Sequence, residues 1–447
     1  MRCGTRRCGS RSCDRVSDDD LAAIETVLAG GDERAAFTKL RARFGWPRGK
    51  ALGRGAASEL VPWIAMLGTL AAKRGAAQLD ELARAVVADP ESPDRLYDLG
   101  FALIDAGVPA IAATVLWRCL ALVGDSEEVV CELVSALETA MAYEDAYAIL
   151  AEREALRAGS FLCQYLFAFD AAMTGRLDVV RETLPKLVVD APEHATMKGT
   201  IERIVERADR VTGTCPLDSG DLRGWHYVLT GGLLLHQSPF GFPTPMHGRY
   251  AWLQDSTARI ATGIDRLKPL IAGLPCIYAP EGRDHEIVAQ AASARLGIPV
   301  APWPAIGVPA PGLIVAYQLE QLPRETLGVL ANRKPDQVLY AHASPWTSDF
   351  PIAPDVTMLL CQSLVAPWGE VMKLDPDTRQ VTRQPADGRS VDDIAAEIVA
   401  STGVGPDELE AEEPARWDAL VEKAWPLTPG PRSRLWAGGP VSSNRFE

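Results

Sequence analysis

Two histidines in the second half of the chain follow short apolar runs that are typical of β-strands. His285 comes shortly after residues 274–279, and His342 ends the run 337–342. A neutral imidazole titrates near neutral pH, so it can take up or release a proton during a reaction. A neighbouring carboxylate could orient either ring. The sequence thus offers four candidate catalytic residues: His285, His342, Asp284 and Glu320.

Other polar side chains follow the same strand-like runs. In an open parallel sheet, ligands bind beyond the carboxyl ends of the strands, where loops leave the sheet and helix amides point outward. An arginine at that edge could hold an anion through charge-assisted hydrogen bonds. The candidate ligand-binding residues are Arg283, Gln318, Ser344 and Gln362. For each histidine, the alternative interpretation is a hydrogen-bonded structural residue.

The spacing of the histidines does not favour a metal site. No His-x3-His or Glu-x2-His pair occurs in the chain, although such pairs place two ligands on one helix face. Nucleotide and hydrolase motifs are also missing, because no Gly-x-Gly-x-x-Gly follows a strand and neither Gly-Lys-Ser/Thr nor Gly-x-Ser-x-Gly occurs. We therefore expect no metal, and the sequence leaves any cofactor unidentified.

The elements that would position these residues alternate between strands and helices. The expected strands are 274–279, 298–301, 312–317, 337–342 and 356–361, and the expected helices are 284–296, 323–332 and one from about Trp252. Residues 225–237 are interpreted as two strands or a hairpin, since two glycines interrupt their apolar run. The alternation predicts a mainly parallel sheet covered by helices, a three-layer α/β domain over residues 222–375.

Residues 278–300, YAPEGRDHEIVAQAASARLGIPV, give a strand, a short loop and a helix that ends in Leu-Gly-x-Pro. This order resembles the first βαβ unit of phosphoribosyltransferases. Residues 312–323 then fall where that family has its phosphoribosyl-diphosphate loop. The family uses paired acids and a Thr-Gly turn, whereas here Glu320 is the single acid and no glycine turn follows. The resemblance implies a Rossmann-like or phosphoribosyltransferase-like domain that takes a phosphorylated or nucleotide-like small molecule.

The first half of the chain carries a 34-residue rhythm of apolar and small residues. Its best unit has Leu99, Gly100, Leu103, Gly107, Ala112, Leu116 and Cys119. Steps of 34 lead first to Leu133, Leu137, Ala146 and Leu150, and then to Ala171, Gly175, Leu184 and Leu187. Within this half the apolar spacing alternates between three and four residues, with glycines at the breaks. The pattern predicts an all-α half built of helical hairpins.

A 34-residue period with a Leu-Gly pair, a turn glycine and a small crossing residue resembles the tetratricopeptide repeat. The units are 58–91, 92–125, 126–159 and 160–193, followed by a closing helix over 194–210. The pattern is degenerate in places: Val134 and Ala168 replace the glycine of the pair, Met141 replaces the turn glycine, and Arg153 replaces a late small residue. The resemblance implies stacked hairpins, a superhelix whose concave surface, lined by the first helix of each pair, binds a protein or peptide. Alternatively, that surface only packs against the second half of the same chain.

Size and charge narrow the classes of partner. The 447 residues exceed what one hydrophobic core usually serves, so we expect more than one domain. The net charge of -14 opposes binding to phosphate backbones or anionic lipids. No apolar run reaches the roughly 20 residues of a membrane-spanning helix, so we expect a cytoplasmic protein without nucleic-acid or membrane partners. The nine cysteines are scattered and odd in number, which favours reduced thiols.

The two ends of the chain differ in composition from the rest. Residues 1–16 hold three cysteines among arginines and are expected to be a disordered leader; 17–210 would be the repeat half and 211–221 a linker. In 376–447 we expect the second strand of a hairpin that turns at 375–377, a helix capped by Ser390, a helix with two tryptophans, and a Pro/Gly-rich tail.

The function expected from these observations is protein binding by the repeat half, with a protein or peptide partner in its groove. The α/β half would carry an unknown activity and could hold a small anionic ligand. The alternative is an enzyme whose α/β half acts on a phosphorylated or nucleotide-like small molecule. A third class is a purely architectural protein.

Overall fold

The computed structural model describes residues 18–239, 246–304, 310–334, 336–374, 380–403, 414–425 and 433–443. The expected leader 1–16 and the expected hairpin turn at 375–377 lie outside these residues. The chain forms two compact units. The first, the helical unit, takes the described residues up to Ala171 together with Pro185–Val188. The second, the α/β unit, takes Ala172–Leu184 and the described residues from Val189 onward. None of the described helices is long and apolar enough to cross a bilayer.

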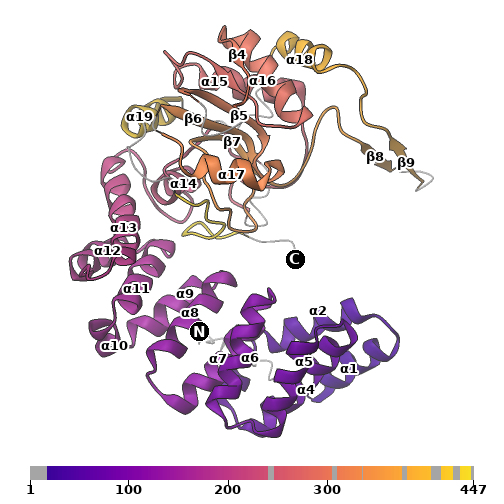
Figure 1. Cartoon of the computed structure of the whole chain (residues 1–447), viewed down its shortest axis with the longest axis vertical. Coiled ribbons are helices and arrows are strands. Elements are labelled where there is room, and N and C mark those ends of the chain that lie inside the picture. Colours follow the sequence, from indigo (N-terminus) through magenta and orange to yellow (C-terminus); the bar gives the residue numbers. More distant parts are fainter. Residues whose placement is uncertain are drawn as a thin grey trace, which may run out of the picture. The chain divides into compact units, whose positions relative to one another are not determined.

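The helical unit consists of consecutive helices that pack pairwise along the chain (Figure 1). They are α1 (Asp18–Ala29), α2 (Glu33–Phe44), α3 (Lys50–Arg54), α4 (Ala57–Lys73), α5 (Ala77–Ala88), α6 (Pro93–Asp105), α7 (Pro109–Val123), α8 (Glu127–Thr139), α9 (Tyr143–Ala151), α10 (Glu154–Gly159) and the start of α11 (Phe161–Met173). Helix α4 packs on α5, α6 on α7, and α8 on α9. The prediction of a helical first half is confirmed.

The 34-residue rhythm reappears in the helix ends. Gly107, Met141 and Gly175 all have positive φ, of 72°, 60° and 81°. Each follows a helix directly after its cap residue and donates its N–H to a carbonyl three residues back, at 2.9, 2.8 and 3.1 Å. A left-handed residue at this position closes the last turn of a helix, and glycine adopts it without a steric penalty. Met141 therefore adopts the left-handed conformation that favours glycine, although it carries a side chain.

The Leu-Gly pair has a packing reason. A Cβ atom built on Gly100 would lie 2.6 Å from Leu116 Cδ2, so only a residue without a side chain lets α6 approach α7 this closely. Leu99 and Leu103 on α6, and Ala112 on α7, are fully buried around this contact. The residues that mark the repeat in the sequence are thus the residues of its helix-helix contact.

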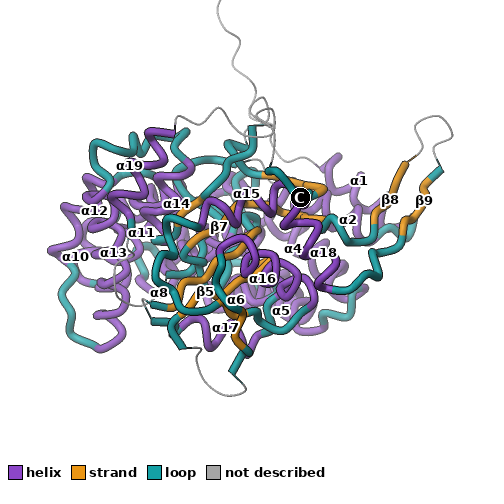
Figure 2. Tube along the Cα trace, turned by 90° about the horizontal axis from the view of Figure 1, so that it is seen from above, coloured by secondary structure: helices purple, strands orange, loops and turns teal. Residues whose placement is uncertain are grey.

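The α/β unit contains every strand that the structure describes. The strands are orange in Figure 2. Its helices are α12 (Leu177–Thr183), α13 (Pro192–Arg210), α14 (Leu222–Thr230), α15 (Thr257–Leu267), α16 (Arg283–Leu296), α17 (Arg324–Ala331), α18 (Val391–Ala400) and α19 (Pro414–Ala424). Its strands are β1 (Leu233–Leu234), β2 (Tyr250–Gln254), β3 (Ile277–Tyr278), β4 (Val300–Ala301), β5 (Gly312–Gln318), β6 (Gln337–Ser344), β7 (Val356–Val365), β8 (Val371–Leu374) and β9 (Val381–Gln384). Short 3-10 turns lie at Leu184–Lys186 and Leu319–Gln321.

The larger sheet is parallel throughout, and its strand order is β1-β7-β6-β5-β3-β4. Strand β2 also pairs with β7, along a later part of β7 than β1 does. Strands β5 and β6 are buried along nearly their whole length, as expected when helices cover a parallel sheet. From β3 the chain first runs outward to β4 and then returns past β3 to β5, so the strand order reverses between β3 and β5. The prediction of a mainly parallel sheet is confirmed.

Alternate residues of the sheet meet different helices. Leu339 and Ala341 of β6 share a core cluster with Leu330 of α17. Tyr340 between them points the other way, and its hydroxyl lies so close to Gly263 of α15 that a Cβ there would come within 2.5 Å of it. Helix α16 packs against β5, with α15 and α18 beside it (Figure 1).

Two expectations near the start of the α/β unit are wrong. Residues 225–237 do not form two strands, because α14 occupies 222–230 and only β1 follows it. The Asp221 side chain accepts from Gly224 N at 2.9 Å and caps the helix, and Gly231, with φ 79°, ends it. The helix expected from about Trp252 begins at Thr257, because residues 250–254 pair with β7 as β2 and Ser256 caps α15.

In the later segment the structure describes a two-stranded antiparallel sheet and a helix capped by Ser390. Strands β8 and β9 pair antiparallel as a small separate sheet. Ser390 accepts from Asp393 N at 3.1 Å and caps α18. In the last described residues, Leu435 forms a β-bridge with Phe350 and is buried.

Candidate functional site

The candidate catalytic histidine His342 lies on β6 in a buried polar cluster. Its Nε2 is 3.0 Å from Asp255 Oδ2, at the residue that follows β2. The hydroxyl of Tyr317, on the neighbouring strand β5, donates to the same oxygen at 2.9 Å. The Tyr317 and His342 rings stack with centroids 5.5 Å apart. Two strands, β5 and β6, thus each bring one side chain to a carboxylate that follows a third strand, β2.

The other carboxylate oxygen of Asp255 is occupied as well. Ser256 N donates to Oδ1 at 2.9 Å and Arg259 Nη1 at 3.0 Å. Burial alone would raise the pKa of Asp255, but the charge of His342 and its hydrogen bonds outweigh burial and hold the pKa below its ordinary value. Burial, and then the charge of Asp255, raise the pKa of Tyr317 well above its ordinary value, so the phenol stays a donor. The buried charge is balanced on every side, as a stable interior carboxylate requires.

His285 lies in the first turn of α16 and joins the same cluster from the other side. Its Nδ1 accepts from the backbone N–H of Tyr317 at 3.0 Å. Burial lowers its pKa, so the ring is neutral and its Nδ1 is the acceptor. His285 and His342 are 2% and 0% exposed. In this arrangement both histidines hold strands and helices together, and a catalytic role for either stays a prediction.

The remaining candidate residues are distributed around that edge. Asp284 Oδ1 accepts from Trp368 Nε1 at 2.6 Å, and the Trp368 ring lies 5.1 Å from that of Tyr317. Ser344 is buried and its Oγ is 2.8 Å from Thr357 Oγ1. Glu320 is exposed in the turn after β5, whereas Gln318 and Gln362 are half-buried on β5 and β7.

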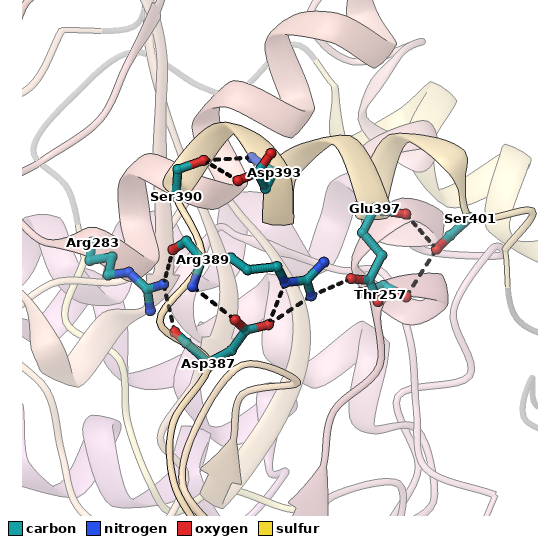
Figure 3. Close-up of polar contacts among 8 residues, drawn as sticks. All are labelled: Thr257, Arg283, Asp387, Arg389, Ser390, Asp393, Glu397 and Ser401. Atoms are coloured by element: carbon teal, nitrogen blue, oxygen red, sulfur yellow. Dashed lines mark hydrogen bonds and ion pairs between the residues drawn. The ribbon is translucent and has the colours of Figure 1, made fainter.

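Arg283 is engaged with the protein itself. One of its terminal nitrogens, Nη2, donates to the backbone oxygens of Asp387 and Arg389 at 2.8 Å each, as Figure 3 shows. Arg389 in turn contacts the carboxylates of Asp387 and Glu397 at 2.7 and 2.6 Å. The guanidinium that could hold an anion therefore ties α16 to the segment before α18.

Sequence reasoning missed two members of the buried cluster, Asp255 and Tyr317. Tyr317 was visible only as part of an apolar strand, and Asp255 only as a residue before a helix start. No fixed spacing links them to His342, because the sheet brings together segments that are far apart in the chain. One local signal could have drawn attention to them. Asp255 and Ser256 place an aspartate and a helix-capping serine directly after a strand, where ligand-binding residues of parallel sheets often lie.

A hollow in the α/β unit also has an orphaned polar atom. It measures about 30 Å³, room for roughly one water molecule, and is lined by His226, Trp346 and Pro440 among others. His226 Nε2 is buried and has no hydrogen-bond partner among the residues that the structure describes, and burial lowers the pKa of His226 to about 4. This hollow is too small for a metabolite. Among the residues described, no three His, Cys, Asp or Glu side chains gather as a metal site.

The helical unit carries a much larger hollow. A groove of about 750 Å³ runs between α5 and α6, lined on α6 by Tyr97, Phe101 and Asp105 and on α5 by Leu79 and Leu82. Phe101 is 46% exposed, which is unusual for a large apolar side chain in a helix that otherwise buries its apolar face. A second hollow of about 210 Å³ shares Leu79 and Ala106 with the groove and extends the apolar surface toward Phe37 and Leu67.

The chain matches no protein-family model, and no curated protein matches it in sequence. The groove offers a binding surface open to solvent, whereas the polar cluster of the α/β unit is closed.

Proposed function

We propose that the chain binds a segment of another protein in the groove between α5 and α6. The single observation that carries this proposal is the exposed Phe101 in a hollow of about 750 Å³. An apolar side chain exposed in a concave surface stabilises an occupant by leaving water when the occupant arrives. Phe101 lies on the first helix of the best-matched repeat, where a tetratricopeptide-like array would present its ligand-binding face.

The finer architecture belongs to the same proposal. The hairpins would stack as a tetratricopeptide-like superhelix, which the recurring left-handed helix ends support. The α/β unit would be a three-layer Rossmann-like or phosphoribosyltransferase-like domain. The protein would act in the cytoplasm without nucleic-acid or membrane partners, consistent with its net charge of -14.

A second candidate function is supported by the strand order. Where the order of a parallel sheet reverses, adjacent loops leave in opposite directions and open a crevice for ligands. Here the reversal lies between β3 and β5, beside Glu320 and the start of α16. An enzyme acting on a phosphorylated or nucleotide-like molecule would use that place. The engaged Arg283 and the buried histidines make it the weaker candidate.

The groove proposal is tested by selecting binders from a random 12-residue peptide library with the full chain. Enriched peptides are then measured by fluorescence anisotropy against the Phe101→Ala variant. The matched control is Val123→Ala, which truncates an exposed apolar residue on α7 that does not line the groove. We expect about tenfold weaker binding to Phe101→Ala and unchanged binding to Val123→Ala. Equal binding to all three proteins, or no enriched peptide, would overturn the proposal.

A further inference from the structure

Helix α6, which lines the groove, and the later helix α8 carry almost exclusively negative charge. Helices α6 and α8 together hold seven acidic residues against one arginine, Arg95. That arginine is already paired, since its Nη1 lies 3.7 Å from Asp89 Oδ2 and donates to Ala85 O at 3.0 Å. The negative charge along these two helices therefore has no matching set of cations on the same helices.

Two of the acids line the groove on either side of its exposed aromatic ring. Asp98 and Asp105 precede and follow Phe101 by three and four positions, so all three share one face of α6. Both carboxylates are exposed, and Tyr97 lies one turn before Phe101. Among the residues that line the groove and the adjoining hollow, the one cation is Arg74, which lies over the Phe37 ring at 5.4 Å.

Acids of α8 reach the same place. Burial, and then the charges of Glu132 and Glu128, raise the pKa of Tyr97 to about 12. The pKa of Glu132 is itself raised by burial and by the charges of Asp105 and Glu128. These carboxylates on α6 and α8 repel one another beside Tyr97 and Asp105, which line the groove. An arriving cation would relieve that repulsion, whereas an arriving anion would add to it.

We infer that the groove selects a cationic segment, one in which an apolar side chain is flanked by Lys or Arg residues. This inference rests on the proposed function. The apolar side chain would cover Phe101, and the flanking cations would lie against Asp98 and Asp105. A cation placed over the Tyr97 or Phe101 ring would also be attracted by the ring face. An acidic or neutral segment would gain the apolar contact alone.

The test uses the full chain and three labelled 12-residue peptides that share a central leucine. The first has four lysines around the leucine, the second has glutamine in their place, and the third has glutamate. We expect the lysine peptide to bind at least tenfold more tightly than the glutamine peptide at 50 mM salt, and the glutamate peptide to bind most weakly. Raising the salt to 500 mM would remove most of the lysine peptide's advantage, because exposed charges are then screened.

Variants separate the charge from the groove. The double variant Asp98→Asn and Asp105→Asn should weaken the lysine peptide at least threefold and leave the glutamine peptide unchanged. The control Glu81→Gln removes an exposed acid of α5 that does not line the groove, and it should change neither peptide. The inference is overturned if the lysine and glutamine peptides bind equally, or if the double variant behaves as the control does.

Failure of the charge inference can be told from failure of the proposed function. Library peptides that need Phe101 but carry no excess of Lys or Arg would overturn the cationic preference and leave protein binding intact. Library peptides that bind equally without Phe101 would overturn the groove itself.

Discussion

The Nε2 atom of His342 lies 3.0 Å from Asp255 Oδ2, in a place where neither side chain meets solvent. The same carboxylate also accepts hydrogen bonds from the side chains of Tyr317 and Arg259 and from the amide of Ser256. A charge in the interior is costly unless it is paired and hydrogen-bonded, and here both oxygens are. These contacts join β5, β6, the end of β2 and the start of α15, so the carboxylate holds these four elements together.

Replacing Asp255 with asparagine should therefore destabilise the α/β unit strongly. The variant keeps the shape but leaves Arg259 buried with no opposing charge, which costs about 3–5 kcal/mol when one partner of a buried pair is removed. Urea unfolding followed by circular dichroism measures the loss. The matched control is Asp265→Asn, which removes the partly exposed partner of Arg295 and should cost less than about 1 kcal/mol. Similar losses in the two variants would contradict this account.

The left-handed backbone of Met141 predicts that replacing this residue with glycine will stabilise the protein. It holds φ 60° at a helix end where the repeats before and after have glycine. A left-handed conformation costs a residue with a side chain about 1–2 kcal/mol, whereas glycine adopts it freely but loses more entropy on folding. Met141→Gly should thus stabilise the helical unit by about 1 kcal/mol. Thermal unfolding checks it, and Gly107→Ala should move stability the opposite way by a similar amount.

The close contact at Gly100 predicts a large loss. A valine there must displace Leu116, because the first side-chain carbon already comes within 2.6 Å of Leu116 Cδ2. Overpacking of this kind costs about 1–3 kcal/mol. Gly100→Val should lower the midpoint of urea unfolding, and shortening the neighbour as well, in Gly100→Val with Leu116→Ala, should recover part of the loss. A double variant less stable than the sum of the single changes would count against the steric explanation.

Buried histidines predict how stability changes with pH. Burial lowers the pKa of His226 to about 4 and that of His236 to about 3, while both titrate near 6.5 in an unfolded chain. Between about pH 6.5 and 4 the unfolded chain binds protons that the folded chain refuses, so stability falls as the pH falls. Each histidine contributes a slope of about 1.4 kcal/mol per pH unit in that window.

Urea unfolding at half-unit pH steps measures this slope. The variant with His226→Asn and His236→Asn should lose the share of these two histidines between pH 6 and 4, while His285, whose pKa burial also lowers, keeps its own share. Asp255, whose pKa is held below its ordinary value, loses its contribution only at lower pH and does not blur the window. An unchanged slope in the variant would show that other groups control the acid response.

Local patterns predicted much of this fold and little of its polar interior. The strands around 312–317, 337–342 and 356–361 are confirmed, because long apolar runs between turn signals have one simple interpretation. Residues 225–237 misled because their two glycines look like a break between strands, whereas Gly231 ends α14 in the left-handed conformation. Asp255 and Tyr317 could not be paired in advance, since only the sheet's strand order brings them together. Phe101 could not be recognised either. An apolar residue in a helix is expected to be buried in the core, and only the structure shows that this one lies on an exposed face.

The recurring left-handed turns at Gly107, Met141 and Gly175 have a consequence for how this chain could change in length. The stretch from Gly107 to Met141 contains α7 and α8, with a left-handed residue at both ends. Duplication or deletion of these 34 codons would therefore add or remove two helices in a single genetic event. The number of helices in the helical unit is a quantity that evolution or an engineer could alter at these turns.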